Sequence, residues 1–325
     1  MKDSFGRIHN YLRLSLTDAC NFRCSYCMPD EDIQCSPHEA LMQTDEILRL
    51  AKTFIKLGVN KIRLTGGEPL VRKEAPEIIR QLSALDTELT ITTNAFLLNK
   101  HFDLLQEVGM RSLNISLDSL DPNKFFMLSK RDAFKKVWAN IMLLLENEFS
   151  VKINVVLMKG INDDEILDFI KLTKELPLHI RFIEFMPFDQ NQWKQERLVS
   201  FEHIIHEASN AFDIIKLPDA PHATTKKFKA IGHEGTFAVI STMTNPFCDS
   251  CNRIRLTADG KMKNCLFSKG ETDLLTALRN GEDIEPLIRS SIFDKKKAWG
   301  GQLKEDMQTE QTAAVDNRSM IRIGG

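Results

Sequence analysis

Strand-like segments alternate with helix-like segments through the first 187 residues of the sequence. The expected strands are residues 11–17, 61–67, 88–94, 111–118, 151–158 and 179–187. Five helices are expected between them. The first begins at Thr44 and ends before Gly58, and the others cover residues 74–85, 99–108, 134–148 and 163–176. A repeated strand–helix unit predicts parallel strands with right-handed crossovers. Six units are fewer than the eight that close a full barrel. We therefore expect an α/β fold built on an open, partial (βα)6 TIM-like barrel, with a doubly wound sheet as the alternative.

The first five strands carry apolar and polar residues at alternating positions. Alternate residues of a strand face opposite sides of a sheet, and a parallel strand buried on both sides should be apolar on both. The polar side is repeatedly basic, through Arg13, Lys61, Arg63 and Lys152. Either this side of the sheet is solvated, or it lines a wide lumen that holds an anionic ligand, and the pattern favours the lumen. The sixth strand is less regular, because Arg181 and Met186 have opposite parity and can both face inward only through a bulge or a strand end.

Six of the seven cysteines fall into two sets of three. The first set is Cys20, Cys24 and Cys27, and the second is Cys248, Cys251 and Cys265. Tetrahedral zinc needs four ligands, whereas three thiolates bind a four-iron cluster and leave one iron open to a small molecule. The alternatives are buried structural cysteines or zinc with a distant fourth ligand; for the second triad this ligand would be His222 or His233, both of which are badly spaced. The seventh cysteine, Cys35, is expected to be an ordinary thiol.

Length, charge and cysteine usage limit the remaining possibilities. The 325 residues allow one large or two ordinary domains, and we expect a partial barrel over 1–187 and a C-terminal extension over 188–325 that closes the barrel and carries the second cluster. A formal charge of −2 predicts no general attraction to nucleic acid or membrane. Clustered cysteines without a signal-peptide pattern indicate a reducing compartment, so a cytoplasmic location is expected.

The C-terminal half offers fewer signals. An amphipathic helix is expected over 201–212, a hairpin over 228–231 and 236–241, and helices over 273–279 and 283–296. His203 and His206 on the first of these helices fit an ordinary surface position better than a metal site. Arg253 and Arg255 lie on one side of an extended segment, where they either bind an anion or are solvated. From the residues alone, the terminal Gly-Gly is typical of a frayed end.

The first cysteine triad, followed by the Gly-Gly-Glu-Pro turn at 66–69, resembles the radical S-adenosylmethionine (SAM) superfamily. Within it the chain resembles the GTP 3′,8-cyclases of molybdenum cofactor (molybdopterin) biosynthesis over nearly its whole length. The segments that carry this resemblance are 12–15, 20–29, 61–69, 92–94, 114–118, 152–154 and 181–186, with the second triad, Arg253, Arg255 and the final Gly-Gly. Residues 187–199 do not contribute to it.

The resemblance implies an enzyme, a lyase, that converts GTP to (8S)-3′,8-cyclo-7,8-dihydroguanosine 5′-triphosphate. Each triad is implied to hold a 4Fe–4S cluster; an electron from the first cleaves SAM, and the resulting 5′-deoxyadenosyl radical removes hydrogen from C3′ of GTP, which then closes onto C8 of guanine. The implied SAM residues are Tyr26, Gly67, Ser116 and Met186. The implied GTP residues are Arg13, Arg63, Thr92, Lys152, Arg181, Arg253 and Arg255. Gly324 and Gly325 are implied to enter the active site, where they and the last two arginines assist turnover.

The implied partners are GTP, an electron donor, the downstream cyclic pyranopterin monophosphate synthase and a second copy of the chain in a homodimer. Two competing interpretations remain. One is another radical SAM enzyme with an auxiliary cluster, such as a peptide-modifying enzyme, and the other is a zinc-binding module without catalysis.

Overall fold

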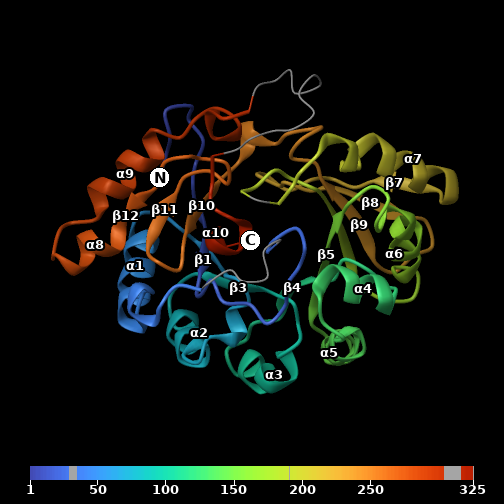
Figure 1. Cartoon of the computed structure of the whole chain (residues 1–325), viewed down its shortest axis with the longest axis horizontal. Coiled ribbons are helices and arrows are strands. Elements are labelled where there is room, and N and C mark those ends of the chain that lie inside the picture. The colour runs from blue at the N-terminus through green and yellow to red at the C-terminus, as the bar shows by residue number, and fades with distance from the viewer. Residues whose placement is uncertain (29–34, 190, 304–315, 325) are drawn as a thin grey trace.

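The computed structural model describes residues 1–28, 35–189, 191–303 and 316–324. One curved sheet runs through this part of the chain, with its twelve strands in the order β12-β11-β10-β1-β2-β3-β4-β5-β6-β9-β8-β7 (Figure 1). Its centre is the predicted set of six parallel strands. They are β1 (Tyr11–Ser15), β2 (Lys61–Thr65), β3 (Glu88–Thr93), β4 (Ser112–Ser116), β5 (Ser150–Leu157) and β6 (His179–Glu184). Because the sheet has two free edges, the expected open barrel is confirmed.

The helices between these strands cover the convex outer face of the sheet (Figure 1). They are α1 (Thr44–Lys56), α2 (Ala75–Ser83), α3 (Leu98–Glu107), α4 (Pro122–Ser129), α5 (Phe134–Glu146) and α6 (Ile166–Leu172). Five of them were predicted within a few residues. The exception is α4, which has only eight residues and whose four apolar residues are consecutive, at 125–128, so that they show no helical period. It is defined instead by Pro122 at its first position and by the Asp121 carboxylate, which accepts hydrogen bonds from the backbone amides of Asn123 and Lys124.

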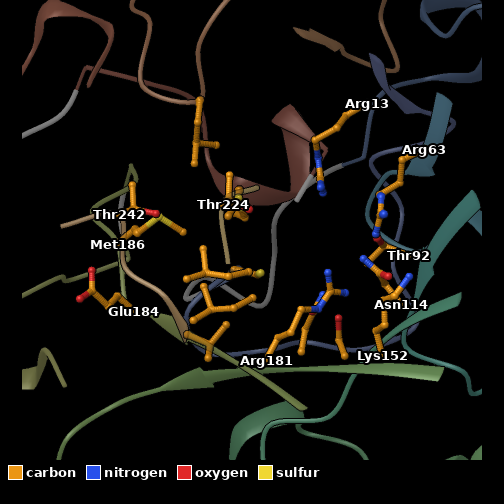
Figure 2. Close-up of a pocket in the computed structure, with 18 of the residues that line it drawn as sticks. Arg13, Arg63, Thr92, Asn114, Lys152, Arg181, Glu184, Met186, Thr224 and Thr242 are labelled. Carbon is orange, nitrogen blue, oxygen red and sulfur yellow. The ribbon is translucent and has the colours of Figure 1, made fainter. Parts of the chain in front are cut away.

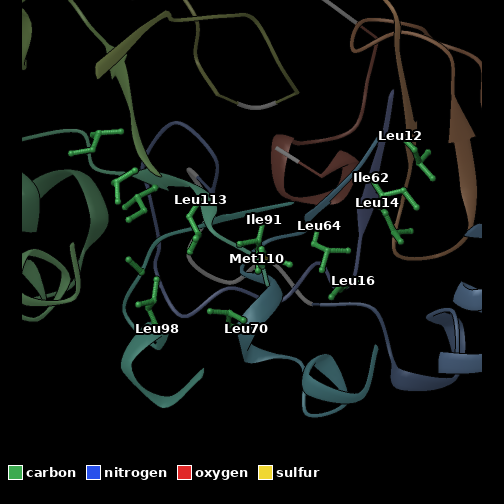
Figure 3. Close-up of a cluster of buried hydrophobic side chains, with 14 of the residues drawn as sticks. Leu12, Leu14, Leu16, Ile62, Leu64, Leu70, Ile91, Leu98, Met110 and Leu113 are labelled. Carbon is green, nitrogen blue, oxygen red and sulfur yellow. The ribbon is translucent and has the colours of Figure 1, made fainter. Parts of the chain in front are cut away.

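Strand register explains why one face of the sheet is apolar. Leu12 of β1 is opposite Ile62 of β2, and Leu14 is opposite Leu64. All four side chains have no exposed surface and lie under the outer helices (Figure 3). Burial of apolar area at roughly 25 cal/mol per Å² makes this layer the main stabilising part of the barrel. The residues between them must therefore face the concave side.

The chain after β6 extends the sheet at both ends. After α7 (Phe201–Ala211), strands β7 (Ile214–Lys216), β8 (Lys226–Ala230) and β9 (Thr236–Ile240) follow, and β9 pairs parallel to β6. Then β10 (Arg253–Leu256) pairs parallel to β1, and β11 (Lys261–Lys263) and β12 (Thr272–Asp273) continue the sheet antiparallel. The predicted hairpin and the predicted helices are present, the latter as α8 (Leu274–Arg279) and α9 (Glu285–Phe293).

The last described residues form a short helix, α10 (Met320–Ile323), which lies in the hollow of the sheet (Figure 1). Ile321 and Ile323 are buried. The expectation of a frayed end, drawn from the residues alone, is therefore wrong for Gly324, because apolar burial holds the helix that precedes it. Gly325 lies outside the described residues. No helix in the described part of the chain is long and apolar enough to cross a membrane.

The junction between β6 and β9 gives a stability prediction. A Cβ atom at Gly235 would overlap the carbonyl oxygen of Leu178 and lie 2.8 Å from that of Leu176, so neighbouring backbone would have to shift. We expect Gly235→Ala to lower the free energy of unfolding by about 1–3 kcal/mol, measured by anaerobic urea denaturation. Gly270→Ala is the matched control, because a Cβ atom there meets nothing within 4 Å. Equal unfolding midpoints for the two variants would contradict the prediction.

Candidate active site

A cavity of about 800 Å³ occupies the concave side of the sheet. It is lined by residues from all six central strands and by all six cysteines of the two triads. Every predicted site residue in the described part of the chain lines it, except Gly324. The sequence patterns thus placed the two triads, the basic strand face and the Gly-Gly-Glu-Pro turn around one space.

The first cysteine loop follows β1 and rests directly on the turn after β2. The amide of Gly67 donates to the carbonyl of Thr17 at 2.7 Å, and the amide of Glu68 donates to that of Ala19 at 2.9 Å. A Cβ atom at Gly67 would lie 2.7 Å from the carbonyl carbon of Ala19. Only glycine allows this approach, so the turn fixes where the cysteine loop sits.

The thiols of the first triad are partly buried at the cavity wall. Burial raises the pKa of Cys20 to about 11, and burial together with the neighbouring Cys27 raises the pKa of Cys24 above its ordinary value. Thiolates in this loop therefore need a strong positive partner, and a coordinated metal deprotonates its thiol ligands outright. Neutral donors lie close to these sulfurs: the amide of Phe22 is 3.4 Å and Asn94 Nδ2 is 3.9 Å from Cys20 Sγ, and the Tyr26 side chain hydrogen-bonds to Cys24.

The second triad combines Cys248 and Cys251, at and after a short 3-10 helix (Cys248–Ser250), with Cys265 beyond β11. Burial raises the pKa of Cys248. Burial also acts to raise the pKa of Cys251, but the positive charges of Lys295 and Arg253 outweigh it, so this pKa is lowered. One thiol of the second triad therefore sits in a positive environment, unlike those of the first.

Each triad brings three thiols close together. Within each triad the thiols affect one another's pKa, so they are neighbours. Yet among residues 1–28, 35–189, 191–303 and 316–324, no three His, Cys, Asp or Glu side chains are placed to hold one metal ion. Zinc draws its sulfurs to about 2.3 Å from one centre. A four-iron cluster takes each thiolate on a separate iron, so three neighbouring thiols are enough to hold one.

A row of arginines crosses the concave face at one register. Arg13 of β1 is paired with Arg63 of β2 on one side and with Arg255 of β10 on the other. In Figure 2, Arg13 and Arg63 point toward the same space as Lys152 and Arg181. Neighbouring strands are about 4.8 Å apart, so the guanidinium groups of Arg13, Arg63 and Arg255 are close enough to repel one another. Burial and the neighbouring cations accordingly lower the pKa of Lys152 to about 8 and also lower that of Arg181.

Several buried polar atoms in this region lack a hydrogen-bond partner among the described residues. They are Arg181 Nε and Nη2, Thr92 Oγ1, Asn114 Oδ1 and Asn154 Oδ1. Buried polar groups are normally satisfied, and orphans that share one cavity indicate a polar ligand. Asn114 and Asn154 were not predicted as ligand contacts, although their place on the polar side of β4 and β5 was a signal for them.

Two buried carboxylates also line the cavity and were not predicted as site residues. Asp118 accepts a hydrogen bond from the Tyr26 hydroxyl at 2.7 Å, and burial raises its pKa to about 6. Glu68 accepts from the amides of Leu70 and Asn94, and burial raises its pKa to about 7. The sequence features that could have indicated them are the end of the fourth expected strand for Asp118 and the Gly-Gly-Glu-Pro turn for Glu68.

The C-terminal tail reaches the arginine row. The carbonyl oxygen of Gly324 accepts hydrogen bonds from Arg255 at 2.6 Å and from Arg13 at 3.5 Å. The tail is anchored at Arg318, whose guanidinium donates to both carboxylate oxygens of Asp259 at 2.9–3.0 Å and to Glu271 at 2.6 Å. The carbonyl group of Gly324 is therefore bound by two arginines that line the cavity.

The comparisons with known proteins agree with this geometry. The Radical SAM superfamily model matches residues 14–173, and the Molybdenum Cofactor Synthesis C model matches residues 178–300. The crystal structure of Streptococcus suis SuiB bound to S-adenosylmethionine has a similar fold, with a TM-score of 0.65 and 15% identity over 98% of this chain and 78% of that one. The fold and the cysteine loop after β1 define a radical SAM protein, and this class implies SAM and a 4Fe–4S cluster.

More similar relatives place the chain within that class. A mitochondrial GTP 3′,8-cyclase from Arabidopsis thaliana is 47% identical, over 99% of this chain and 83% of the relative. The GTP 3′,8-cyclase of Alkaliphilus oremlandii is 39% identical over the full length of both chains. Human molybdenum cofactor biosynthesis protein 1 is 42% identical over 99% of this chain, which spans about half the length of that relative. The chain belongs to the GTP 3′,8-cyclase family.

The Arg318 anchor gives a prediction about the tail. Because hydrogen bonds between charged groups contribute roughly 1.5–3 kcal/mol when partly buried, we expect Arg318→Ala to speed amide exchange in α10 by at least about tenfold, measured by hydrogen–deuterium exchange. Lys269→Ala is the control, since the Lys269–Asp316 pair also holds this segment but is exposed and screened by solvent. If both variants exchange alike, Arg318 is not the anchor.

Proposed function

We propose that this chain is a GTP 3′,8-cyclase, converting GTP to (8S)-3′,8-cyclo-7,8-dihydroguanosine 5′-triphosphate as the first step of molybdopterin biosynthesis. The observation that carries the proposal is a single cavity lined by two cysteine triads and a row of arginines. The names of the most similar relatives support it.

The residues present suit the cofactors that this activity requires. We assign Cys20, Cys24 and Cys27 to the cluster that binds SAM, and Cys248, Cys251 and Cys265 to a second 4Fe–4S cluster. Tyr26, Gly67, Ser116 and Met186, all on the cavity wall, are assigned to SAM. Bound together, the first cluster and SAM supply one-electron chemistry that can remove hydrogen from an unactivated C–H bond. The protein's own task is to bind, orient and shield the nucleotide.

The cations of the concave face suit a triphosphate. Arginine presents a planar fork of donors that matches phosphate oxygens, and Lys152 adds a point charge. We assign Arg13, Arg63, Thr92, Lys152 and Arg181 to GTP. The unpartnered nitrogens of Arg181 and the unpartnered Thr92 hydroxyl are donors that such a ligand would satisfy.

Arg253 and Arg255 are assigned to the guanine end of GTP. Both follow Cys251 on β10 and line the cavity together with the second triad. Arg253 Nη2 already donates to Thr224 Oγ1 at 2.8 Å, which aligns its guanidinium. A nucleobase held there would present its acceptor edge to fixed donors, and orientation of this kind is a large part of catalysis.

The tail is the remaining part of the proposed machinery. We assign Gly324 and Gly325 to the active site, where they assist turnover. Gly324 has a left-handed φ of 75°, and a Cβ atom there would lie 2.8 Å from Thr65 Oγ1 and 3.1 Å from Ser15 Cβ. A side chain at this position would push the tail away from Arg255. The stacked rings of Phe188 and Phe267, which cluster with Ile323, give the cavity an apolar wall that helps to exclude water.

The proposal extends to domain roles and partners. We infer that residues 1–187 form the SAM-binding barrel and residues 188–325 complete the substrate cavity, because β9 and β10 continue the barrel sheet on both sides. A one-electron reaction requires an electron donor, and the product requires the cyclic pyranopterin monophosphate synthase downstream. A cytoplasmic homodimer completes the proposal; free cysteines suit a reducing compartment, and two-fold dimers are the commonest oligomers.

Two experiments on one anaerobic sample test this function. We expect about eight iron atoms per chain, from two four-iron clusters, and we expect GTP, SAM and a reductant to yield 5′-deoxyadenosine with a cyclised nucleotide. Omitting GTP is the control. Stoichiometric zinc in a colourless protein would favour a binding module. If the yield of 5′-deoxyadenosine is the same with and without GTP, and no nucleotide product forms, the substrate is a different one, such as a peptide. The converging cations of the cavity argue against that outcome, because a peptide substrate does not need them.

The lowered pKa of Lys152 predicts a pH dependence of GTP binding. Burial and the neighbouring cations lower this pKa from 10.5 to about 8, although the ammonium also donates to Ser112 Oγ at 2.8 Å, so Lys152 loses its proton near pH 8. The charged form binds phosphate, so affinity should be highest below pH 8 and fall by about tenfold between pH 7 and 9.5, as one charge is lost. Calorimetry with a nonreactive GTP analogue measures this. Lys152→Met should bind weakly with a flatter profile; an unchanged profile would refute the assignment.

A further inference from the structure

Three successive lysines follow α9, and their environments differ. Lys296 and Lys297 are exposed, whereas Lys295 is 3% exposed. A buried ammonium group is costly unless it is paired and hydrogen-bonded. No carboxylate forms an ion pair with Lys295 in the described part of the chain. Something else must therefore balance this charge.

The ammonium group of Lys295 has three neighbours. Its Nζ lies 3.0 Å from the carbonyl oxygen of Arg253, 3.5 Å from His9 Nδ1 and 3.7 Å from Cys251 Sγ. An ammonium has three protons, so each neighbour can accept one. Of the three acceptors, only the Cys251 sulfur becomes an anion, when it ligates a metal.

The N-terminal segment sets the direction of these hydrogen bonds. His9 Nε2 lies 3.0 Å from Asp3 Oδ2, which also accepts from Arg7 Nε at 2.6 Å. The carboxylate accepts a hydrogen bond from Nε2–H of a neutral imidazole, which leaves Nδ1 as an acceptor for Lys295. This tautomer is assigned from the hydrogen-bond network. Arg7 then donates to the carbonyls of Cys248 and Lys297 at 2.9 and 2.7 Å, which ties the lysine segment to the second cysteine loop.

Among the described residues, no charged side chain is seen to donate a hydrogen bond to a sulfur of the first triad. Arg23, whose charge acts on Cys20, donates instead to the backbone carbonyls of Cys20 and Phe22. The donors that reach Cys20 Sγ, the Phe22 amide and Asn94 Nδ2, are neutral. The two triads are therefore asymmetric, with a fixed positive charge beside a sulfur of the second.

We propose that Lys295 is a positioning residue for the second cluster, donating a charged hydrogen bond to the Cys251 thiolate and raising the reduction potential of that cluster. This inference rests on the second cluster of the proposed function. A cluster becomes more negative when it gains an electron, so a fixed cation beside a ligand sulfur stabilises the reduced form more than the oxidised form. Asp3, His9 and Arg7 hold the lysine in place, and the second cluster is the easier of the two to reduce.

The test is a redox titration of the full-length protein with both clusters assembled, followed by electron paramagnetic resonance. Addition of SAM assigns the signals, because SAM perturbs only the cluster of the first triad. For Lys295→Met we expect the ratio of reduced to oxidised second cluster to fall about tenfold at a fixed potential, a shift of about −59 mV for one electron. The first cluster should not move. Lys297→Met is the matched control and should leave both midpoints unchanged.

Lys295→Arg keeps a cation in the same position and should retain most of the wild-type midpoint. If Lys295→Met cannot retain the second cluster while Lys295→Arg holds eight irons, the need for the charge is again supported. Loss of the cluster from both variants, or an unchanged midpoint in a fully loaded Lys295→Met protein, would overturn the inference. A wild-type protein with only four irons would instead refute the second cluster of the proposed function, so the two failures are distinguishable.

Discussion

The concentration of positive charge on the concave face is the constraint on which the rest of this molecule depends. Parallel pairing puts Arg255, Arg13 and Arg63 side by side in one register row, and Lys152 and Arg181 face the same cavity. Repulsion between buried cations costs folding energy, which the apolar layer beneath the helices offsets. Function provides a reason for such an arrangement, since an anion entering the cavity relieves that repulsion and gains the desolvated donors at the same time.

Beside the basic concave face, the position of the first triad is fixed by backbone contacts rather than by side chains. The Gly66–Gly67 turn contacts the chain at Thr17 and Ala19 so closely that no side chain fits between them. The second triad is held differently, by the N-terminal Asp3–Arg7–His9 group and the segment after α9. Two similar sets of three thiols therefore sit in different surroundings, one with neutral donors and one beside an ammonium group.

Much of this structure could be predicted from the sequence because its signals are periodic. Alternation along β1 to β5 predicted the apolar layer and the basic lumen, and the spacing of the cysteines predicted two groups of neighbouring thiols on one cavity. Other features depend on contacts between distant segments and carry no local signal. Lys295 is indistinguishable in sequence from Lys296 and Lys297, and Asp3 and His9 belong to a polar N-terminal stretch without any motif. The sequence did not predict the short helix α4 for a simpler reason: eight residues are too few to reveal a helical period.

The open barrel leaves two sheet edges, and their position matters. Without residues 188–325, β1 and β6 would be the edges, each with a full row of unpaired backbone groups beside apolar side chains. Such edges invite strand addition from other molecules. The C-terminal strands move the edges outward to β12, which has two residues, and to β7, which has three and ends in Lys216. Edges this short are poor templates for intermolecular pairing, so the same segments that shape the cavity also guard the protein against aggregation.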